Sequence, residues 1–255
     1  MAISLEPLNA DRDAFFEHGY VVIPGVVPAD GLDAVNEALD RARAHTIAGT
    51  RRFVNERELL KDRRFFDVIT QPRIVDTLKG ILGDDLQILD FGAMEDPPGT
   101  GRIRSWHSDF HHSFPIVERP PLMVTLLIYL SDMTDERGPL YVRPGTHRLL
   151  RHPTGEESGT PIADEVKVSV PAGAGVAFHS NLWHSGSPNA TESPRRLLFS
   201  LWGHYWMKRL DEFYETPLPE FVREADDPWA RQLFGVATHA PSVHGNDYNP
   251  VAYGG

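Results

Sequence analysis

Between about residue 86 and residue 206, short apolar runs alternate with Gly/Pro turns, and this pattern limits the possible folds more than any other feature. The runs are rich in Val, Ile, Leu and aromatic residues, which favour strands. They cover residues 87–95, 120–130, 138–145, 164–173, 173–180 and 195–206. Because no helical pattern separates them, we predict a mainly β fold with flanking helices, in the form of an antiparallel sandwich or jelly roll.

The flanks of this region show helical patterns instead. Leu32–Ala44 spaces its apolar residues as a helix does, and Phe65–Leu82 does the same with a break at Gln71-Pro72. A short strand is predicted within GYVVIPGVV (19–27), and an interrupted helix over 220–234.

No repeat or linker divides the chain, so we expect one domain over residues 1–255. Its parts are a mostly helical stretch over 1–85, a β core over about 86–206, and a helix and tail over 207–255. The segment 151–164 is polar and rich in Gly and Pro, which predicts a loop.

Composition excludes several classes of function. The formal net charge of −11 disfavours nucleic acids and anionic membranes as partners. The absence of cysteine removes disulfides and thiolate chemistry, so any metal must be bound by His, Asp or Glu. The first residues resemble no secretory signal, and no apolar run is long enough to span a membrane. We therefore expect a cytoplasmic protein, whose oligomeric state the sequence leaves open.

Two segments carry side chains that suit a metal site. In an extended SWHSD (105–109), His107 and Asp109 project to the same face and Ser108 to the other. His184 lies in a Gly/Ser-rich turn after an apolar run. Two imidazoles and one carboxylate form the facial triad typical of non-haem Fe(II). No HExxH helix indicates a zinc hydrolase, although these three donors do not by themselves exclude zinc.

Three motifs occur in an order that resembles the phytanoyl-CoA dioxygenase family of Fe(II)/2-oxoglutarate oxygenases. They are DPPGTGRIRSWHSDFHHSFP (96–115), IYLSDMTDERGPLYVRPGTH (128–147) and VPAGAGVAFHSNLWHSGSPNATESPRR (170–196). The resemblance implies a double-stranded β-helix, which is a cupin-like jelly roll, with His107, Asp109 and His184 as catalytic iron ligands. It also implies that a strand arginine, here Arg195, pairs with the distal carboxylate of 2-oxoglutarate. The adjacent Arg196 is expected on the other face, and Thr125 is expected to assist the co-substrate.

The reaction implied by this resemblance uses Fe(II), 2-oxoglutarate and O2, and it releases succinate and CO2 while a C–H bond of a small molecule is oxidised. In related halogenases a small residue replaces the carboxylate ligand. Asp109 is kept here, which favours hydroxylation, desaturation, epimerisation or ring closure. Many members have a lysine where this chain has Asp96, which argues against an acyl-CoA or other anionic substrate.

Four further residues are candidates for the substrate pocket: Phe110, His111, His112 and Trp183. Ordinary polar or supporting roles for the two histidines are the alternative. Two other functions compete with the dioxygenase. One is a non-catalytic jelly-roll binding protein. Such a protein should have lost at least one of the three triad residues or Arg195, and all four are present here. The other is a cupin-like isomerase with a different metal, which would leave Arg195 without a purpose.

Overall fold

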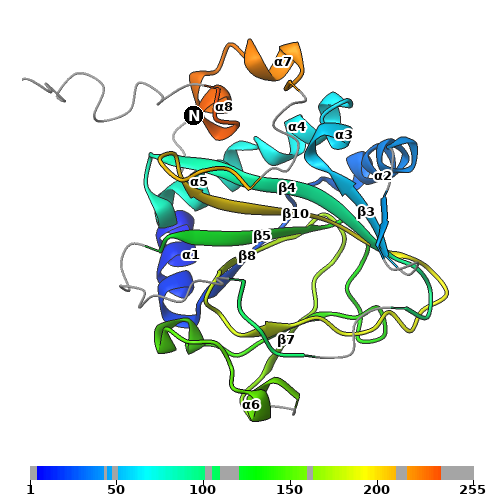
Figure 1. Cartoon of the computed structure of the whole chain (residues 1–255), viewed down its shortest axis with the longest axis vertical. Coiled ribbons are helices and arrows are strands. Elements are labelled where there is room, and N and C mark those ends of the chain that lie inside the picture. The colour runs from blue at the N-terminus through cyan, green and yellow to red at the C-terminus, as the bar shows by residue number, and fades with distance from the viewer. Residues whose placement is uncertain are drawn as a thin grey trace, which may run out of the picture.

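Two antiparallel sheets face each other across the molecule (Figure 1). The computed structural model describes residues 5–42, 45–47, 51–100, 105–109, 121–159, 163–210 and 217–236. The large sheet has the strand order β1-β8-β5-β10-β4-β3-β2, and the small sheet has the order β7-β6-β9. This arrangement confirms the predicted jelly roll.

Every apolar run predicted as a strand contains one. The large sheet consists of β1 (Tyr20–Ile23), β2 (His45–Ile47), β3 (Arg51–Asn55), β4 (Leu86–Asp96), β5 (Met123–Tyr129), β8 (Gly175–His179) and β10 (Arg195–His204). The small sheet consists of β6 (Leu140–Val142), β7 (Val166–Val168) and β9 (His184–Ser185). The β2–β3 pair was not foreseen, because RRFVN carries two charges and shows no apolar run.

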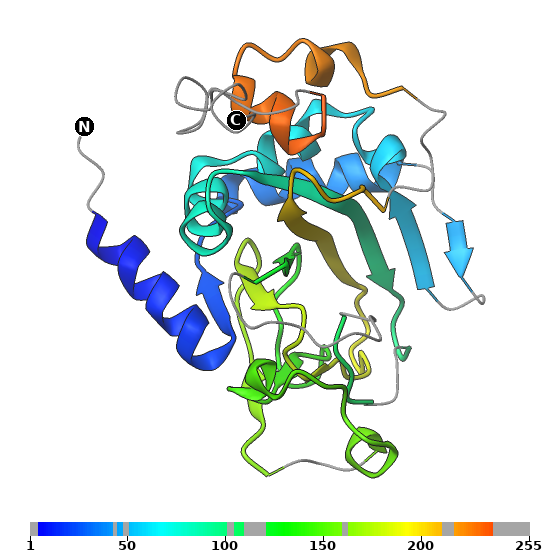
Figure 2. The ribbon, with the colours of Figure 1, turned by 60° about the vertical axis from the view of Figure 1, so that its left-hand side comes forward.

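Helices cover the face of the large sheet that points away from the small sheet (Figures 1 and 2). They are α2 (Leu32–Arg41), α3 (Glu56–Leu59), α4 (Arg63–Ile69), α5 (Pro72–Leu82), α7 (Glu220–Arg223) and α8 (Pro228–Leu233). The helix α1 (Leu5–His18) contacts α5 and β1. The predicted loop 151–164 contains the short helix α6 (Gly155–Gly159), and two 3-10 turns occupy Ala29–Gly31 and Thr146–Leu149.

The predicted break between two helices lies where the sequence places it. Pro72 is the first residue of α5, where its missing N–H costs no hydrogen bond. Gly83 ends α5 with a φ of 88°, a conformation that a side chain would strain. Likewise, the helix predicted over 220–234 is interrupted before Pro228. The single-domain organisation stays a prediction.

Side-chain alternation along the central strands separates two apolar layers. On β5, Val124, Leu126 and Ile128 pack against the helices, whereas the residues between them face the small sheet. On β10, Leu198 and Trp202 likewise belong to the helix-facing core. Each such fully buried aliphatic side chain contributes about 1.5–3 kcal/mol. The opposite face of the large sheet is thereby left to line a cavity.

Within the described ranges, no helix is long and apolar enough to span a membrane.

One buried histidine makes the stability of this fold depend on pH. His179, at the end of β8, packs against the rings of Phe15 and His147. Its Nδ1 accepts a hydrogen bond from the backbone N–H of Asn181 at 3.0 Å. Burial, with a smaller contribution from His147, lowers the pKa of His179 to about 3.

We predict that His179→Gln flattens the acid dependence of stability. Since an unfolded histidine has a pKa of about 6.5, the unfolded chain binds this proton more readily, and stability falls as the pH drops below that value. The loss from His179 is about 1.6 kcal/mol between pH 6.5 and pH 5. Urea unfolding across this range measures it. The exposed His18→Gln is the control, and a His179→Gln slope equal to that of the wild type would contradict the prediction.

Candidate metal centre and active site

The backbone brings the two candidate histidines together. The N–H of His107 donates to the carbonyl of His184 at 3.1 Å, and the N–H of His184 donates back to the carbonyl of His107 at 2.9 Å. The N–H of Asp109 donates to the carbonyl of Ser180 at 2.8 Å. The segment 105–109 therefore runs beside β9 and the end of β8. Ser108 points to the opposite side, where its hydroxyl meets Nδ1 of His152 at 2.7 Å.

Hydrogen bonds to backbone carbonyls set the tautomer of both imidazoles. Nδ1 of His107 lies 3.0 Å from the carbonyl oxygen of Ser105, and Nδ1 of His184 lies 2.9 Å from that of Leu182. A carbonyl oxygen only accepts, so each Nδ1 must carry the proton. In the neutral ring this leaves the Nε2 lone pair for a metal, which is the usual arrangement of a histidine ligand.

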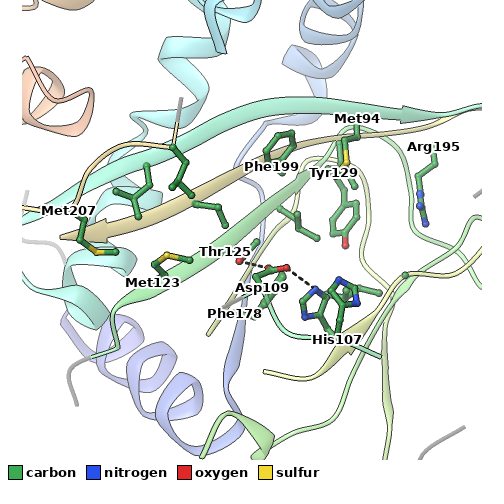
Figure 3. A pocket seen from close by; sticks show the side chains of 18 of the residues that line it. Met94, His107, Asp109, Met123, Thr125, Tyr129, Phe178, Arg195, Phe199 and Met207 are labelled. Atoms are coloured by element: carbon green, nitrogen blue, oxygen red, sulfur yellow. Dashed lines mark hydrogen bonds and ion pairs between the residues drawn. The ribbon is translucent and has the colours of Figure 1, made fainter. Parts of the chain in front are cut away.

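Asp109 completes the group. Its Oδ1 lies 3.5 Å from Nε2 of His184, and its Oδ2 accepts a hydrogen bond from the Thr125 hydroxyl at 2.7 Å (Figure 3). One ligand atom from each of His107, Asp109 and His184 lies within 4.8 Å of the others. Two imidazole nitrogens and one carboxylate oxygen at this spacing fit one divalent transition-metal ion and leave other coordination positions open.

These three residues border a cavity of about 870 Å³ between the two sheets. Inward-facing residues of β10 line it in sequence: Arg195, Leu197, Phe199 and Leu201. In Figure 3, Arg195 lies at one end, Met123 and Met207 lie at the other, and His107 and Asp109 lie between them. The cavity therefore has a charged end and an apolar end, with the triad in the middle.

Arg195 is held rigidly at its end of the cavity. Its Nε donates to Oδ2 of Asp96 at 3.0 Å, and its Nη2 donates to the same oxygen. Its Nη1 donates to the carbonyls of Gly138 and, at 2.9 Å, Ser187. A guanidinium has five N–H donors, and these bonds use four of them. The sequence did not foresee the partnership with Asp96, because β4 and β10 are far apart in the chain.

Arg196 points away from the cavity, as strand alternation predicts. Its Nε donates to Oε2 of Glu95 at 2.6 Å, and its Nη2 donates to Oδ1 of Asp40 at 2.7 Å. Arg195 is thus the arginine of this pair that lines the cavity.

Two cavity residues have roles that the sequence did not indicate. The Thr125 hydroxyl donates to Asp109, so it orients a candidate ligand; its contact with a co-substrate stays a prediction. Tyr129 lines the cavity near Arg195, and burial raises the pKa of its phenol. Its hydroxyl consequently stays protonated and is able to donate a hydrogen bond. Its position on β5, two strand repeats after Thr125, is the signal that could have identified it.

The structure places Trp183 in the core and not on the cavity wall. Its ring is fully buried, its Nε1–H donates to the carbonyl of Arg151 at 2.9 Å, and it is absent from the cavity lining. The predicted substrate contact for Trp183 is therefore replaced by a packing role, because the residue next to an inward-facing His184 points outward. Phe110, His111 and His112 lie outside the described residues.

The fold and these three donors define a jelly-roll protein with a candidate mononuclear metal site. The family model of phytanoyl-CoA dioxygenase (PhyH) matches residues 15–197. This match covers well over half of the chain, so the protein belongs to the phytanoyl-CoA dioxygenase family of Fe(II)/2-oxoglutarate oxygenases.

Curated relatives and solved structures agree with this family. The chain is 28% identical to an ectoine dioxygenase of Stutzerimonas stutzeri, over 87% of this chain and 85% of that protein. It is 27% identical to dioxygenase af480 of Aspergillus fumigatus, over 93% and 79%. The structure of HygX from Streptomyces hygroscopicus, with nickel, 2-oxoglutarate and hygromycin B bound, superposes with a TM-score of 0.67. It shares 18% identity and covers 79% of this chain and 89% of its own, and it supports the fold.

We predict that nickel(II) binding requires the triad. His184→Ala should abolish binding measured by calorimetry, because only two of the three protein ligands remain. Thr125→Val should weaken it by about 10–100-fold, because the Asp109 carboxylate loses the hydroxyl that orients it. His18→Ala removes an exposed histidine on α1 and should bind as the wild type does. Wild-type affinity in His184→Ala would contradict the ligand assignment.

We also predict that Asp96→Ala destabilises the fold by about 3–5 kcal/mol, because it leaves the buried Arg195 guanidinium without its counter-ion. The matched control is Asp135→Ala. It breaks an exposed pair with Lys167 and should cost less than about 1 kcal/mol. Urea unfolding compares the two variants, and equal losses would show that the buried pair is not important for stability.

Proposed function

We propose that this chain is an Fe(II)- and 2-oxoglutarate-dependent dioxygenase that oxidises a C–H bond of a small molecule and releases succinate and CO2. The observation that carries the proposal is the triad itself. Both imidazoles present Nε2 to the same point as the Asp109 carboxylate, and a buried arginine faces the same cavity. Family membership supports the same reaction class.

Each residue has a separate task in this proposal. His107 and His184 bind Fe(II) through Nε2, and Asp109 binds it through a carboxylate oxygen. Arg195 pairs with the distal carboxylate of 2-oxoglutarate through the Nη2 N–H that its bonds to Asp96, Gly138 and Ser187 leave over, and a guanidinium keeps its charge at any physiological pH. Because its Asp96 partner holds it in place, the co-substrate meets a pre-oriented donor, and the protonated Tyr129 phenol offers a second one.

When bound, iron supplies the O2 chemistry that couples decarboxylation of 2-oxoglutarate to C–H oxidation. The protein contributes ligands, orientation and a cavity walled mainly by apolar side chains. With Asp109 as the third protein ligand, no position is vacated for a halide. We therefore propose hydroxylation, or another outcome of the same C–H abstraction, and not halogenation.

The proposed partner is a small molecule, and the proposed location is the cytoplasm. The net charge of −11 argues against nucleic acids and anionic membranes. Relatives named as ectoine dioxygenases and as an L-proline trans-4-hydroxylase act on small molecules, which supports this choice.

Anaerobic titration with Fe(II) and then 2-oxoglutarate tests the proposal through the weak visible charge-transfer band of the chelate. We expect the band in the wild type and succinate once air and a substrate are supplied. Asp109→Ala should abolish turnover. If neither band nor succinate forms, the chain is a non-catalytic jelly-roll binding protein or an isomerase that uses another metal.

Arg195→Ala should raise the 2-oxoglutarate concentration at half-maximal band intensity by about 10–100-fold, as expected for a lost charge-assisted pair. Arg196→Ala is the matched control, because it removes the neighbouring arginine from the other face of the same strand. Equal titrations for the two variants would refute the assignment of Arg195.

A further inference from the structure

The end of the cavity away from Arg195 is lined by aliphatic and methionine side chains. We call Leu89, Met123, Leu201, Met207 and Leu210 the apolar seat. Met123 lies two residues before Thr125 on the same face of β5, and Leu201 is the strand partner of Thr125. Because the Thr125 hydroxyl binds Asp109, the seat begins directly beside the metal triad.

The seat is built by specific backbone features. The β4–β10 register shifts between Leu201 and Trp202: Leu201 faces Asp90 and Trp202 faces Ile88, so that Leu89 is an extra residue in a β-bulge. A bulge redirects a side chain, and Leu89 here lines the cavity.

Met207 and Leu210, which follow β10 in the chain, form one wall of the seat and are hydrogen-bonded to β4. The N–H of Leu210 donates to the carbonyl of Leu89 at 2.8 Å. The side-chain amide of Gln87 donates to the carbonyl of Met207 at 2.5 Å. These two bonds fix the wall relative to the bulge, so the seat is a preformed surface.

The seat offers little to a polar ligand. Of the described residues that line this end, Lys208 is the one with a charge, and the exposed Trp206 beside it adds aromatic surface. A zwitterion the size of an amino acid would lose its hydration here without gaining partners, which is unfavourable. Methionines adapt to irregular apolar shapes. The whole cavity, with a volume of about 870 Å³, has room for 2-oxoglutarate at the Arg195 end and for a second small molecule in the seat.

We propose that the substrate is a mid-sized, uncharged molecule with a mainly hydrocarbon skeleton, which packs in the apolar seat with the oxidised C–H bond next to Asp109. This inference rests on the proposed function, because it assigns the charged end of the same cavity to 2-oxoglutarate. It separates this chain from relatives whose names specify a small zwitterion, such as the L-proline trans-4-hydroxylase.

The experiment uses the whole chain with Fe(II) and 2-oxoglutarate, kept anaerobic, and the neutral polarity-sensitive dye Nile red as the probe. We expect saturable binding at one site, displacement by 1-adamantanol, and no displacement by L-proline. Leu201→Glu and Met207→Glu should each weaken dye binding by about tenfold or more, because a carboxylate in the seat must be desolvated. Both side chains are half-buried, so the variants should fold, and thermal unfolding checks this. Leu149→Glu makes the same change at an exposed position and is the matched control.

The chelate band is recorded in the same samples, so the two proposals fail separately. A normal band with no saturable dye binding, with displacement by L-proline, or with unchanged affinity in both seat variants would overturn the substrate class alone. Absence of the band would overturn the dioxygenase proposal and with it the assignment of an oxidised substrate, whatever the dye does.

Discussion

The backbone pairing of His107 with His184 is the constraint on which the rest of the site depends. Two reciprocal N–H···O bonds, with a third from Asp109 to Ser180, fix three candidate ligands in one short ladder. A slip of this ladder by one residue would turn His107 and Asp109 away from the cavity and bring Ser108 into it. The metal geometry is therefore set by strand register, and the carbonyls that hold each Nδ1 come from the same two segments.

Alternation along β10 arranges the chemistry in space. The inward residues progress from Arg195 through Leu197 and Phe199 to Leu201, so a single strand presents a cation at one end and an apolar surface at the other. Between these two ends of β10, close packing restricts the positions of the side chains. The ring of Phe199 occupies the space above Gly92, where an added Cβ would lie 2.5 Å from it. In the proposed arrangement, co-substrate and substrate take separate places on opposite sides of the triad.

Asp96 shows how a departure from the family pattern becomes intelligible in three dimensions. Where the resemblance to the family implies a lysine, this chain has an acid that is buried against Arg195. The pair balances its own charge and holds the guanidinium in one orientation, which favours pre-organisation of the co-substrate site. It also leaves no extra cation at this position for an anionic substrate, in agreement with the apolar character of the other end of the cavity.

The sequence by itself determined the strand runs, the helix break at Pro72, the side-by-side projection of His107 and Asp109, and the opposite faces of Arg195 and Arg196. These features follow from hydrophobic periodicity and turn residues within a few positions of one another, so they can be read without knowing the contacts made by distant parts of the chain. Only the tertiary structure decided the Thr125–Asp109 and Asp96–Arg195 pairs and the bulge at Leu89. Each depends on the register between strands distant in sequence, and that register is set by the packing of the whole sheet, which no local pattern specifies.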